Sequence, residues 1–430
     1  MSRDSRDTTL RQAVEIESAA PAPWSGVTLV DLFVSTANLN GQALAFAEPL
    51  TSGGRVTRRT YAEAAETVDN LLQRIEEIGL DPGSRIALAM GGSVESPLAL
   101  LAVLKAGMVP CLLPPWLPAG DLSKALGDSG AEAVVTVAAL GALKPAEIMR
   151  AACAMDDGPR FILAFGDRLP AGVVPLSDAM AQGGSSDFFN VFDASRSRPT
   201  PVLTLSRGPT GPLWIEHDQE ALIARGLGVV TRANLGSAEA ILSTLAPLSA
   251  AALATGLVPA LLTGATLHLH GVFESAKLLD QLAMMSKPHL VAPAALERAL
   301  LQADLLGGPA VSSTLLLHRP PARMDQRERA RRLDSPVIDL LALGEKGLAI
   351  GQRDARGVPD LSCAPLRVPD SVDGALVLEM KLDQGRLLLR GEGVSGRPPG
   401  STALNWADAQ LTARLDGDRL VAVEPSASAR

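Results

Sequence analysis

One short stretch of the sequence, residues 203–217, has the residue types of a loop that holds a phosphate group. Residues 202–205 predict a buried strand, residues 206–212 a turn of small residues, and residues 216–228 a helix. In such a segment the loop N–H groups converge on an anion, and the helix N-terminus adds positive potential. The candidate residues for binding an anion or a nucleotide are Ser206, Arg207, Gly208, Thr210 and Gly211.

The same stretch lacks the group that a phosphate-binding loop most needs. Between Ser206 and His217 the one cation is Arg207, which precedes the glycines, and there is no lysine. Backbone N–H groups together with Arg207 could still hold an anion. The segment could instead be a vestigial turn between a strand and a helix, which the missing lysine favours, and the residues alone leave both interpretations open.

The composition limits the class of protein. Of the 430 residues, 47% are hydrophobic and 20% charged, which predicts a globular chain with more than one lobe. A net charge of -8 argues against nucleic acid or an anionic membrane as the partner. The three cysteines lie far apart and lack metal-binding spacing, so we expect a reducing, cytoplasmic setting. Prolines and glycines interrupt the uncharged run 246–267, which predicts a buried core helix and no membrane span.

The order of the expected elements indicates the architecture that positions these residues. Strands and helices alternate over residues 85–137, which predicts parallel βαβ units with helices on both faces of a sheet. A second α/β lobe is expected over about residues 201–336, with strands at 202–205, 265–269, 289–292 and 313–318. From about residue 371, short alternating strands separated by Gly and Asp turns predict a small β-rich lobe.

Three segments resemble a known family. Thr60–Glu63, Gly79–Leu88 and Leu100–Pro110 follow one another as in the N-terminal half of the adenylate-forming superfamily, and the likeness runs from about residue 28 to 423. That superfamily contains acyl- and aryl-CoA synthetases, peptide-synthetase adenylation domains and luciferases. The resemblance implies two doubly wound α/β lobes and a small C-terminal β-rich lobe, without the family's mobile C-terminal domain. The expected division is a flexible tail (1–24), a first α/β lobe (25–200), a second α/β lobe with a degenerate phosphate loop (201–370), and a β-rich lobe ending at the family hinge (371–430).

The catalytic motifs of the family are eroded in this sequence. The family's phosphate loop continues into Pro-Lys-Gly, whereas Leu213–Ile215 occupies that place here. In the family's Tyr-Gly-hydrophobic-Thr-Glu run, the tyrosine stacks on adenine, the threonine touches the phosphate and the glutamate binds magnesium. Here Leu341 replaces the tyrosine and Gly344 the threonine, and Glu345 alone keeps the acidic position that implies a magnesium ligand.

The resemblance also implies where a ligand pocket would lie. In the family an aromatic residue or a histidine closes the acyl pocket, and the small residues Ser249 and Ala250 stand at that position. The candidate pocket residues are therefore Trp214, Ser249, Ala250 and Leu341. His268 and His270 alternate on an expected strand and share a face, but the sequence offers no third metal ligand nearby.

The sequence favours a catalytically degenerate relative that binds an acyl or aryl ligand or a protein partner. ATP or AMP with magnesium would be its cofactors only if the eroded site still binds a nucleotide. One alternative is an acid–AMP or acyl-CoA ligase that uses a separate C-terminal domain, or acts with a carrier protein. A second alternative is a structural subunit of a biosynthetic complex. A fold alone does not choose among them, because chemistry resides in sites.

Overall fold

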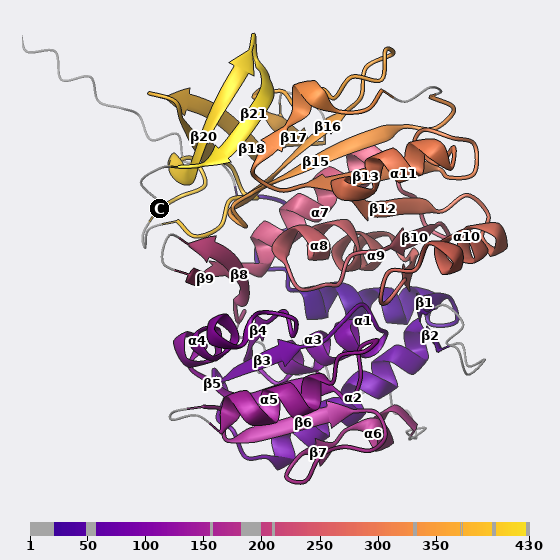
Figure 1. Ribbon diagram of the computed structural model, residues 1–430, viewed down its shortest axis with the longest axis vertical. Helices are drawn as coiled ribbons and strands as arrows, with labels where there is room; N and C mark the ends of the chain where they lie inside the picture. Colours follow the sequence, from indigo (N-terminus) through magenta and orange to yellow (C-terminus); the bar gives the residue numbers. More distant parts are fainter. Residues whose placement is uncertain are drawn as a thin grey trace, which may run out of the picture.

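Three β-sheets organise the molecule (Figure 1). The computed structural model describes residues 21–48, 57–154, 158–181, 199–208, 211–329, 333–369, 371, 373–397 and 401–426. In Figure 1 the first lobe fills the lower half, the second lies above it, and a smaller β-sheet stands at the upper left. This confirms the expected mixture of two α/β lobes with a β-rich one.

The first lobe is a doubly wound seven-stranded sheet in the order β7-β6-β5-β3-β4-β8-β9, and its strands run parallel except for the last pair. Alternate residues of β3 face opposite helix layers: Ile86 and Leu88 share a core with α2 and α3, whereas Ala87 and Ala89 share one with α4 and α5. The strands are β3 (Arg85–Ala89), β4 (Val109–Leu112), β5 (Ala131–Val137), β6 (Phe161–Phe165), β7 (Val174–Pro175), β8 (Val202–Gly208) and β9 (Gly211–His217). The helices are α1 (Leu29–Asn40), α2 (Tyr61–Glu77), α3 (Glu95–Lys105), α4 (Ala119–Ser129), α5 (Pro145–Cys153) and α6 (Ser177–Ala181).

The second lobe is an eight-stranded sheet in the order β16-β15-β13-β12-β10-β11-β1-β2, parallel in its interior and antiparallel at both edges. Its strands are β1 (Leu44–Ala47), β2 (Arg58–Thr60), β10 (Ala240–Ser243), β11 (Thr266–Leu269), β12 (His289–Pro293), β13 (Ser313–His318), β15 (Val337–Leu343) and β16 (Gly347–Gln352). Its α-helices are α7 (Gln219–Ala233), α8 (Ala250–Thr255), α9 (Leu257–Thr263), α10 (Ser275–Met284) and α11 (Glu297–Gln302). Short 3-10 turns occupy Ala294–Leu296 and Met324–Gln326.

The third sheet is antiparallel throughout, in the order β14-β21-β20-β19-β18-β17. Its strands are β14 (Ala322–Arg323), β17 (Leu366–Val368), β18 (Ala375–Asp383), β19 (Arg386–Arg390), β20 (Ala407–Asp416) and β21 (Arg419–Pro425). The alternating strands after residue 371 therefore form the expected β-rich lobe. Helix α7 contacts β16, β17 and β18, so it joins the second lobe to this sheet.

Two expectations about residues 202–228 are wrong. The strand that begins at Val202 pairs with β4, so it belongs to the first sheet and not to the second. The segment after the small residues is strand β9, which pairs with β8 from Val202↔His217 to Gly208↔Gly211, and the helix begins only at Gln219. Trp214 and Ile215 suit a half-buried strand, and Asp218 precedes the helix as its N-cap residue.

Sheet membership also crosses the expected lobe boundaries. Strands β1 and β2 precede the first lobe's strands in sequence, yet they complete the edge of the second sheet through the β1–β11 pair. Most of the expected tail, residues 1–20, lies outside the described residues. The uncharged run 246–267 forms α8 and α9, which are buried almost throughout. Among the helices in the described part of the chain, none is long and apolar enough to cross a bilayer.

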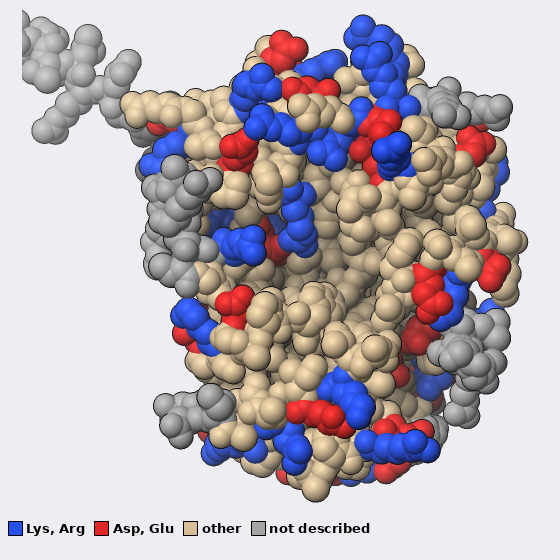
Figure 2. Space-filling view, viewed as in Figure 1, with Lys and Arg blue, Asp and Glu red and all other residues tan. Residues whose placement is uncertain are grey.

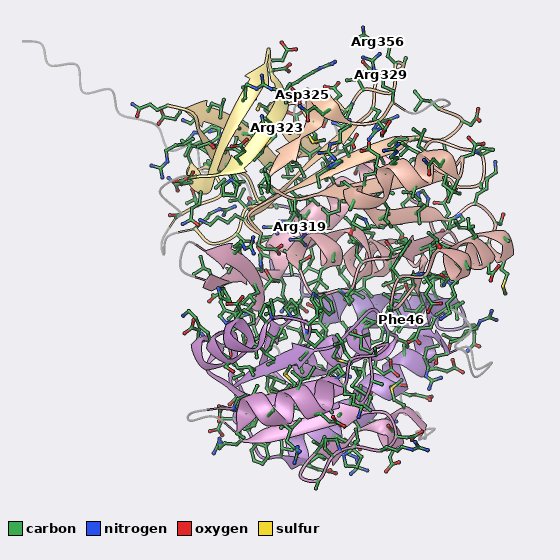
Figure 3. The ribbon with its side chains drawn as sticks, in the orientation of Figure 1. Phe46, Arg319, Arg323, Asp325, Arg329 and Arg356 are labelled. Carbon is green, nitrogen blue, oxygen red and sulfur yellow. The ribbon has the colours of Figure 1, made fainter. Side chains whose placement is uncertain are left out.

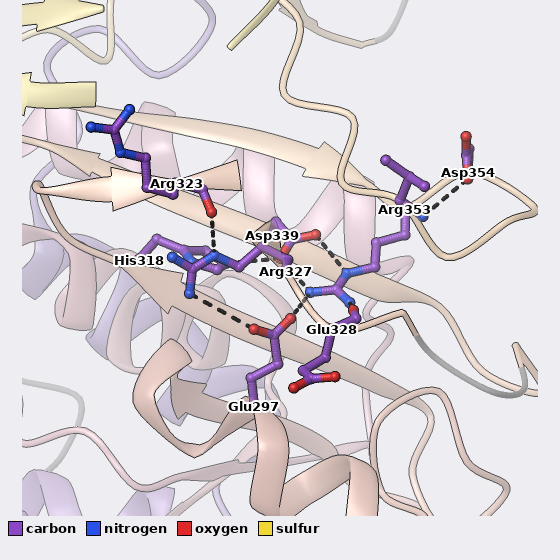
Figure 4. Close-up of polar contacts among 9 residues, drawn as sticks. Glu297, His318, Arg323, Arg327, Glu328, Asp339, Arg353 and Asp354 are labelled. Carbon is purple, nitrogen blue, oxygen red and sulfur yellow. Dashed lines mark hydrogen bonds and ion pairs between the residues drawn. The ribbon is translucent and has the colours of Figure 1, made fainter. Parts of the chain in front are cut away.

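A buried ionic network braces the second sheet (Figure 4). Arg353 donates to both carboxylate oxygens of Asp339, at 2.8 and 2.9 Å, and to Glu297 Oε1 at 2.5 Å. His318 Nε2 lies 2.8 Å from Asp339 Oδ1 and donates to it, because a carboxylate can only accept. Although burial alone would raise it, the pKa of Asp339 is lowered by the hydrogen bonds from His318 and Arg353. The network joins β13, β15, β16 and α11.

The glycines Gly226 and Gly127 give a matched test of the packing in this fold. A Cβ on Gly226 of α7 would lie 2.4 Å from Val258 Cγ1 and 2.9 Å from Val258 Cβ, on the adjoining helix α9. A Cβ on Gly127 of α4 would have no neighbour within 4 Å. We expect Gly226→Ala to lower the free energy of unfolding by about 1–3 kcal/mol through overpacking. We expect Gly127→Ala to raise it by up to about 1 kcal/mol, because alanine favours the helix. Urea denaturation measures both, and equal effects would contradict the close α7–α9 contact.

Candidate functional site

The carboxylate of Glu345 is the centre of a cluster built by residues of the first and second lobes. Glu345 follows β15, and its side chain is 2% exposed. Its Oε2 accepts hydrogen bonds from Thr204 Oγ1 of β8 at 3.0 Å and from the Ala250 N–H at 2.7 Å. Its Oε1 accepts one from Arg319 Nη1 at 2.9 Å. Both oxygens are therefore engaged by groups of the protein itself.

Arg319 completes this cluster from the carboxyl end of β13. Its Nη1 pairs with Glu345, and its Nη2 donates to Ser249 Oγ at 2.8 Å. The Arg319 side chain keeps 51% of its surface exposed. Figure 3 places it near the middle of the molecule, and Figure 2 shows that this face is hollowed between the lobes, with basic side chains along one side of the hollow. A half-exposed guanidinium in such a position offers a charged donor to an anionic ligand.

A buried chain of hydrogen bonds runs from Glu345 through Thr204 to His217. Thr204 donates its one hydroxyl proton to Glu345, so the contact of 2.7 Å between Thr204 Oγ1 and His217 Nε2 must use the imidazole N–H. His217 Nδ1 then carries no proton, and it is buried without a hydrogen-bond partner. Burial lowers the pKa of His217 well below its usual value, and the nearby charge of Arg225 lowers it further. The imidazole is therefore neutral.

Arg225 fixes the backbone around the cluster. It projects from α7, is 1% exposed, and donates to Gly393 O at 2.7 Å, Glu345 O at 3.1 Å and Lys346 O at 2.7 Å. A further hydrogen bond of 2.8 Å reaches Ser395 Oγ. Burial lowers the pKa of Arg225 to about 10, which still leaves it charged at neutral pH. One guanidinium thus ties the loop after β15 to the third lobe.

The turn that presents Glu345 has an unusual backbone. Gly344 and Glu345 have φ angles of 60° and 62°, in the left-handed region that residues other than glycine seldom adopt. Such a conformation persists only where surrounding contacts hold it. Here Arg225 binds the carbonyls of Glu345 and Lys346, and the Glu345 side chain has three donors.

The structure brings together three of the residues singled out in the sequence, namely Ser249, Ala250 and Glu345. Leu341 is fully buried in β15 as part of the main core. Trp214 lies on the other face of the β8–β9 hairpin, where its Nε1 donates to Ala125 O of α4 at 3.0 Å. It packs against α4 and Leu203, and the structure does not bring it to Ser249.

The candidate anion-binding residues lie on the hairpin. Ser206, Arg207, Gly208 and Gly211 are residues of the ladder that ends at Gly208↔Gly211, and Thr210 lies outside the described residues. By strand alternation Arg207 shares its face with Leu205, opposite to the face of Thr204. The structure therefore separates Arg207 from the Glu345 carboxylate, and its role in binding an anion stays a prediction.

The sequence alone did not single out three residues of this site, Thr204, Arg225 and Arg319. The available signal was the position of Arg319 directly after a parallel strand, where ligand-binding side chains gather. No motif marks Arg225, because its partners lie 120 to 170 residues away in sequence.

The described residues contain no group of three or more His, Cys, Asp or Glu that could hold a metal ion. His268 and His270 have separate surroundings, since His270 Nδ1 contacts Gln281 Oε1 at 2.5 Å and its Nε2 accepts from Glu274 N–H.

Comparison with known proteins shows a similarity over part of the chain and a shared fold. Residues 33–174 match the family model described as AMP-binding enzyme. The N-terminal domain of FACL13 from Mycobacterium tuberculosis has the same fold, with a TM-score of 0.69 at 17% identity over 93% of this chain and 99% of that one. Over residues 33–174 the chain is therefore similar to AMP-binding enzymes. It has the fold of the N-terminal domain of these enzymes.

Sequence relatives match over part of their length. The long-chain-fatty-acid–CoA ligase of Salmonella typhimurium is 33% identical over 110 residues, which are 26% of this chain and 19% of that ligase. The salicyl-AMP ligase / salicyl-S-ArCP synthetase of Mycobacterium tuberculosis is 26% identical over 246 residues, which are 56% of this chain and 42% of that enzyme. The chain thus spans less than half of either relative.

The Arg225 clamp can be tested by substitution. Arg225→Met removes four hydrogen bonds and leaves buried acceptors without donors, so we expect the free energy of unfolding to fall by at least about 3 kcal/mol. Arg160→Met, at a position where the side chain is 66% exposed, serves as the control and should change it by less than about 0.5 kcal/mol. Chemical denaturation followed by circular dichroism measures both. A loss below about 1 kcal/mol for Arg225→Met would contradict the clamp.

The neutral state of His217 predicts a pH dependence of stability. Because the pKa of His217 is lowered in the folded chain, the unfolded chain binds a proton below about pH 6.5 that the folded chain does not. The free energy of unfolding should therefore fall as the pH drops below that value, by up to about 1.4 kcal/mol per pH unit for this one group. His217→Gln should make the slope between about pH 6.5 and 5 shallower. His268, whose pKa is lowered to about 4 by burial and by Arg58, should add a loss of the same sign. An unchanged slope in His217→Gln would mean that the folded chain protonates His217.

Proposed function

We propose that this chain is a catalytically degenerate member of the superfamily. It binds an acyl or aryl carboxylate, or a protein partner, at the cleft beside Arg319, and it does not form an adenylate on its own. The observation that carries the proposal is the ion pair of 2.9 Å between Arg319 and Glu345. The family resemblance makes Glu345 the candidate magnesium ligand, and here that carboxylate is neutralised by the protein's own guanidinium.

The contacts of Glu345 oppose binding of a magnesium ion. Magnesium requires carboxylate oxygens in near-octahedral geometry, and both oxygens of Glu345 already accept hydrogen bonds from Arg319, Thr204 and Ala250. A divalent cation at Glu345 would also lie beside the Arg319 charge, and like charges at such a distance repel. Magnesium could bind only after Arg319 moved away.

The sequence departures point in the same direction. No lysine follows the hairpin glycines, Leu341 stands where the family stacks a tyrosine on adenine, and Gly344 replaces the threonine that touches phosphate. Loss of one electrostatic group in an active site typically lowers the rate about 100- to 1000-fold. Losses of this kind are not additive, but together they favour a binding role over turnover.

The exposed half of Arg319 supplies the chemistry for a carboxylate ligand. Its guanidinium is held in place by Ser249 and Glu345, so little conformational freedom is lost when an anion binds. The two small residues Ser249 and Ala250 lie next to it. An acyl or aryl acid could therefore present its carboxylate to Arg319, and a protein partner could present an acidic side chain in the same way.

Calorimetry with magnesium and ATP tests the proposal. We expect no magnesium-dependent ATP binding at millimolar nucleotide, and no acyl-adenylate with decanoate, benzoate or salicylate. Formation of an adenylate by the purified chain would overturn the proposal. If magnesium–ATP binds and Glu345→Ala weakens that binding, the ligase alternative is favoured instead. This binding can be measured on the chain alone, without a separate C-terminal domain.

Titration with the same three carboxylates, without nucleotide, tests the ligand. Arg319→Ser should weaken binding at least about tenfold, the value of one charge-assisted hydrogen bond. Arg323→Ser removes a guanidinium of similar exposure, 46%, which pairs with Glu424 outside the cluster, and it should leave binding unchanged. If no carboxylate binds, the small-molecule part of the proposal is wrong, and a protein partner or a structural role takes its place.

A further inference from the structure

A separate cavity of about 310 Å³ lies in the first lobe. It shares no residue with the Glu345 cluster. Its walls come from the loop between β3 and α3, from the residues that follow β5 and β6, and from Glu48 after β1. These are the carboxyl ends of three neighbouring parallel strands. A space of this size suits a small organic molecule.

The cavity lies at a switch point in the topology of the first sheet. β3 and β5 are neighbours, and the chain leaves β3 towards β4 on one side and leaves β5 towards β6 on the other. The two crossovers therefore diverge, and a crevice opens at the carboxyl ends of β3 and β5. In doubly wound sheets ligands bind at this kind of switch point. Gly91 and Ser93 line the cavity on the β3 side, and Val137 and Leu140 line it on the β5 side.

The polar groups in the cavity carry one sign of charge. Glu48, Glu95 and Asp167 line it, and none of the described lining residues is basic. Glu48 Oε1 accepts from the Val94 N–H at the start of α3. Burial and the charge of Glu95 raise the pKa of Glu48 to about 7.

Ser93 supplies a second, independent observation. It lines the cavity, and its buried Oγ has no hydrogen-bond partner among the described residues. Buried hydroxyls are nearly always paired, so this oxygen is a candidate partner for a donor group of a ligand. The rest of the wall includes apolar side chains. A Cβ on Gly91 would lie 2.4 Å from Leu140 Cδ1, and Phe165 contributes an aromatic surface.

We propose that the switch-point cavity of the first lobe binds a small primary amine with an apolar body. The ammonium group would donate to Glu48, Glu95 and Ser93, and the apolar part would lie against Leu140 and Phe165. An ammonium fits better than a metal ion, because the described carboxylates do not form a group of three metal ligands. The proposal does not depend on the function proposed for the Glu345 cluster.

Isothermal titration of the full chain with three molecules of similar shape tests the charge requirement. The probes are phenethylamine, which is a cation, phenethyl alcohol, which is neutral, and hydrocinnamate, which is an anion. We expect the amine to bind at least about tenfold more tightly than the alcohol, and the anion not to bind. Equal affinity for the amine and the alcohol, or no binding of the amine at millimolar concentration, would overturn the proposal.

Variants of the cavity locate the bound amine. Glu95→Gln and Glu48→Gln should each weaken amine binding about 10- to 100-fold, as expected for loss of a charge-assisted hydrogen bond. Leu140→Trp should block the cavity and abolish binding. Glu147→Gln, an exposed glutamate on α5 outside the cavity, is the matched control and should bind as the wild type does. If Glu48→Gln fails to fold, the part-exposed Glu95→Gln still decides, and unchanged affinity in that variant sinks the idea.

Discussion

The candidate site depends on the hydrogen bonds that the buried guanidinium of Arg225 donates. The guanidinium reaches from α7 to the carbonyls of Glu345 and Lys346 and to Gly393 and Ser395 of the third lobe. A fully buried charge is tolerated only when its donors are satisfied, and Arg225 meets this condition with backbone and hydroxyl oxygens. Because these acceptors belong to two lobes, the same contact that satisfies the charge also fixes where the lobes meet. The left-handed turn at Glu345 rests on it.

The consequence of this arrangement is a carboxylate whose partners are all internal. Glu345 is held by β8 through Thr204, by the start of α8 through Ala250, and by the end of β13 through Arg319. The motif resemblance implies a magnesium ligand at this position, and the structure places a guanidinium beside it. In the proposed function this fixed positive group selects anionic ligands.

The two α/β lobes share an architecture, yet they present different chemistry at the carboxyl ends of their strands. In the second lobe these ends carry His318, Arg319 and Glu345, braced by the buried network of Asp339 and Arg353. In the first lobe they surround a cavity lined by the carboxylates of Glu48, Glu95 and Asp167. Parallel sheets collect loops at one edge whatever their sequence, so one fold can hold two sites of opposite charge.

The sequence by itself determined the architecture. Alternation of strands and helices predicted the doubly wound lobes, the short strands after residue 371 predicted the third sheet, and the interrupted apolar run predicted buried helices, because periodicity and turn residues act locally. It did not determine that β8 joins the first sheet, or that residues 211–217 form a strand, since pairing with β4 overrides local preference. Glu345 was found from its motif. Arg319 and Arg225 were not, because their partners lie 26 to 170 residues away and only the tertiary structure brings them within hydrogen-bonding distance.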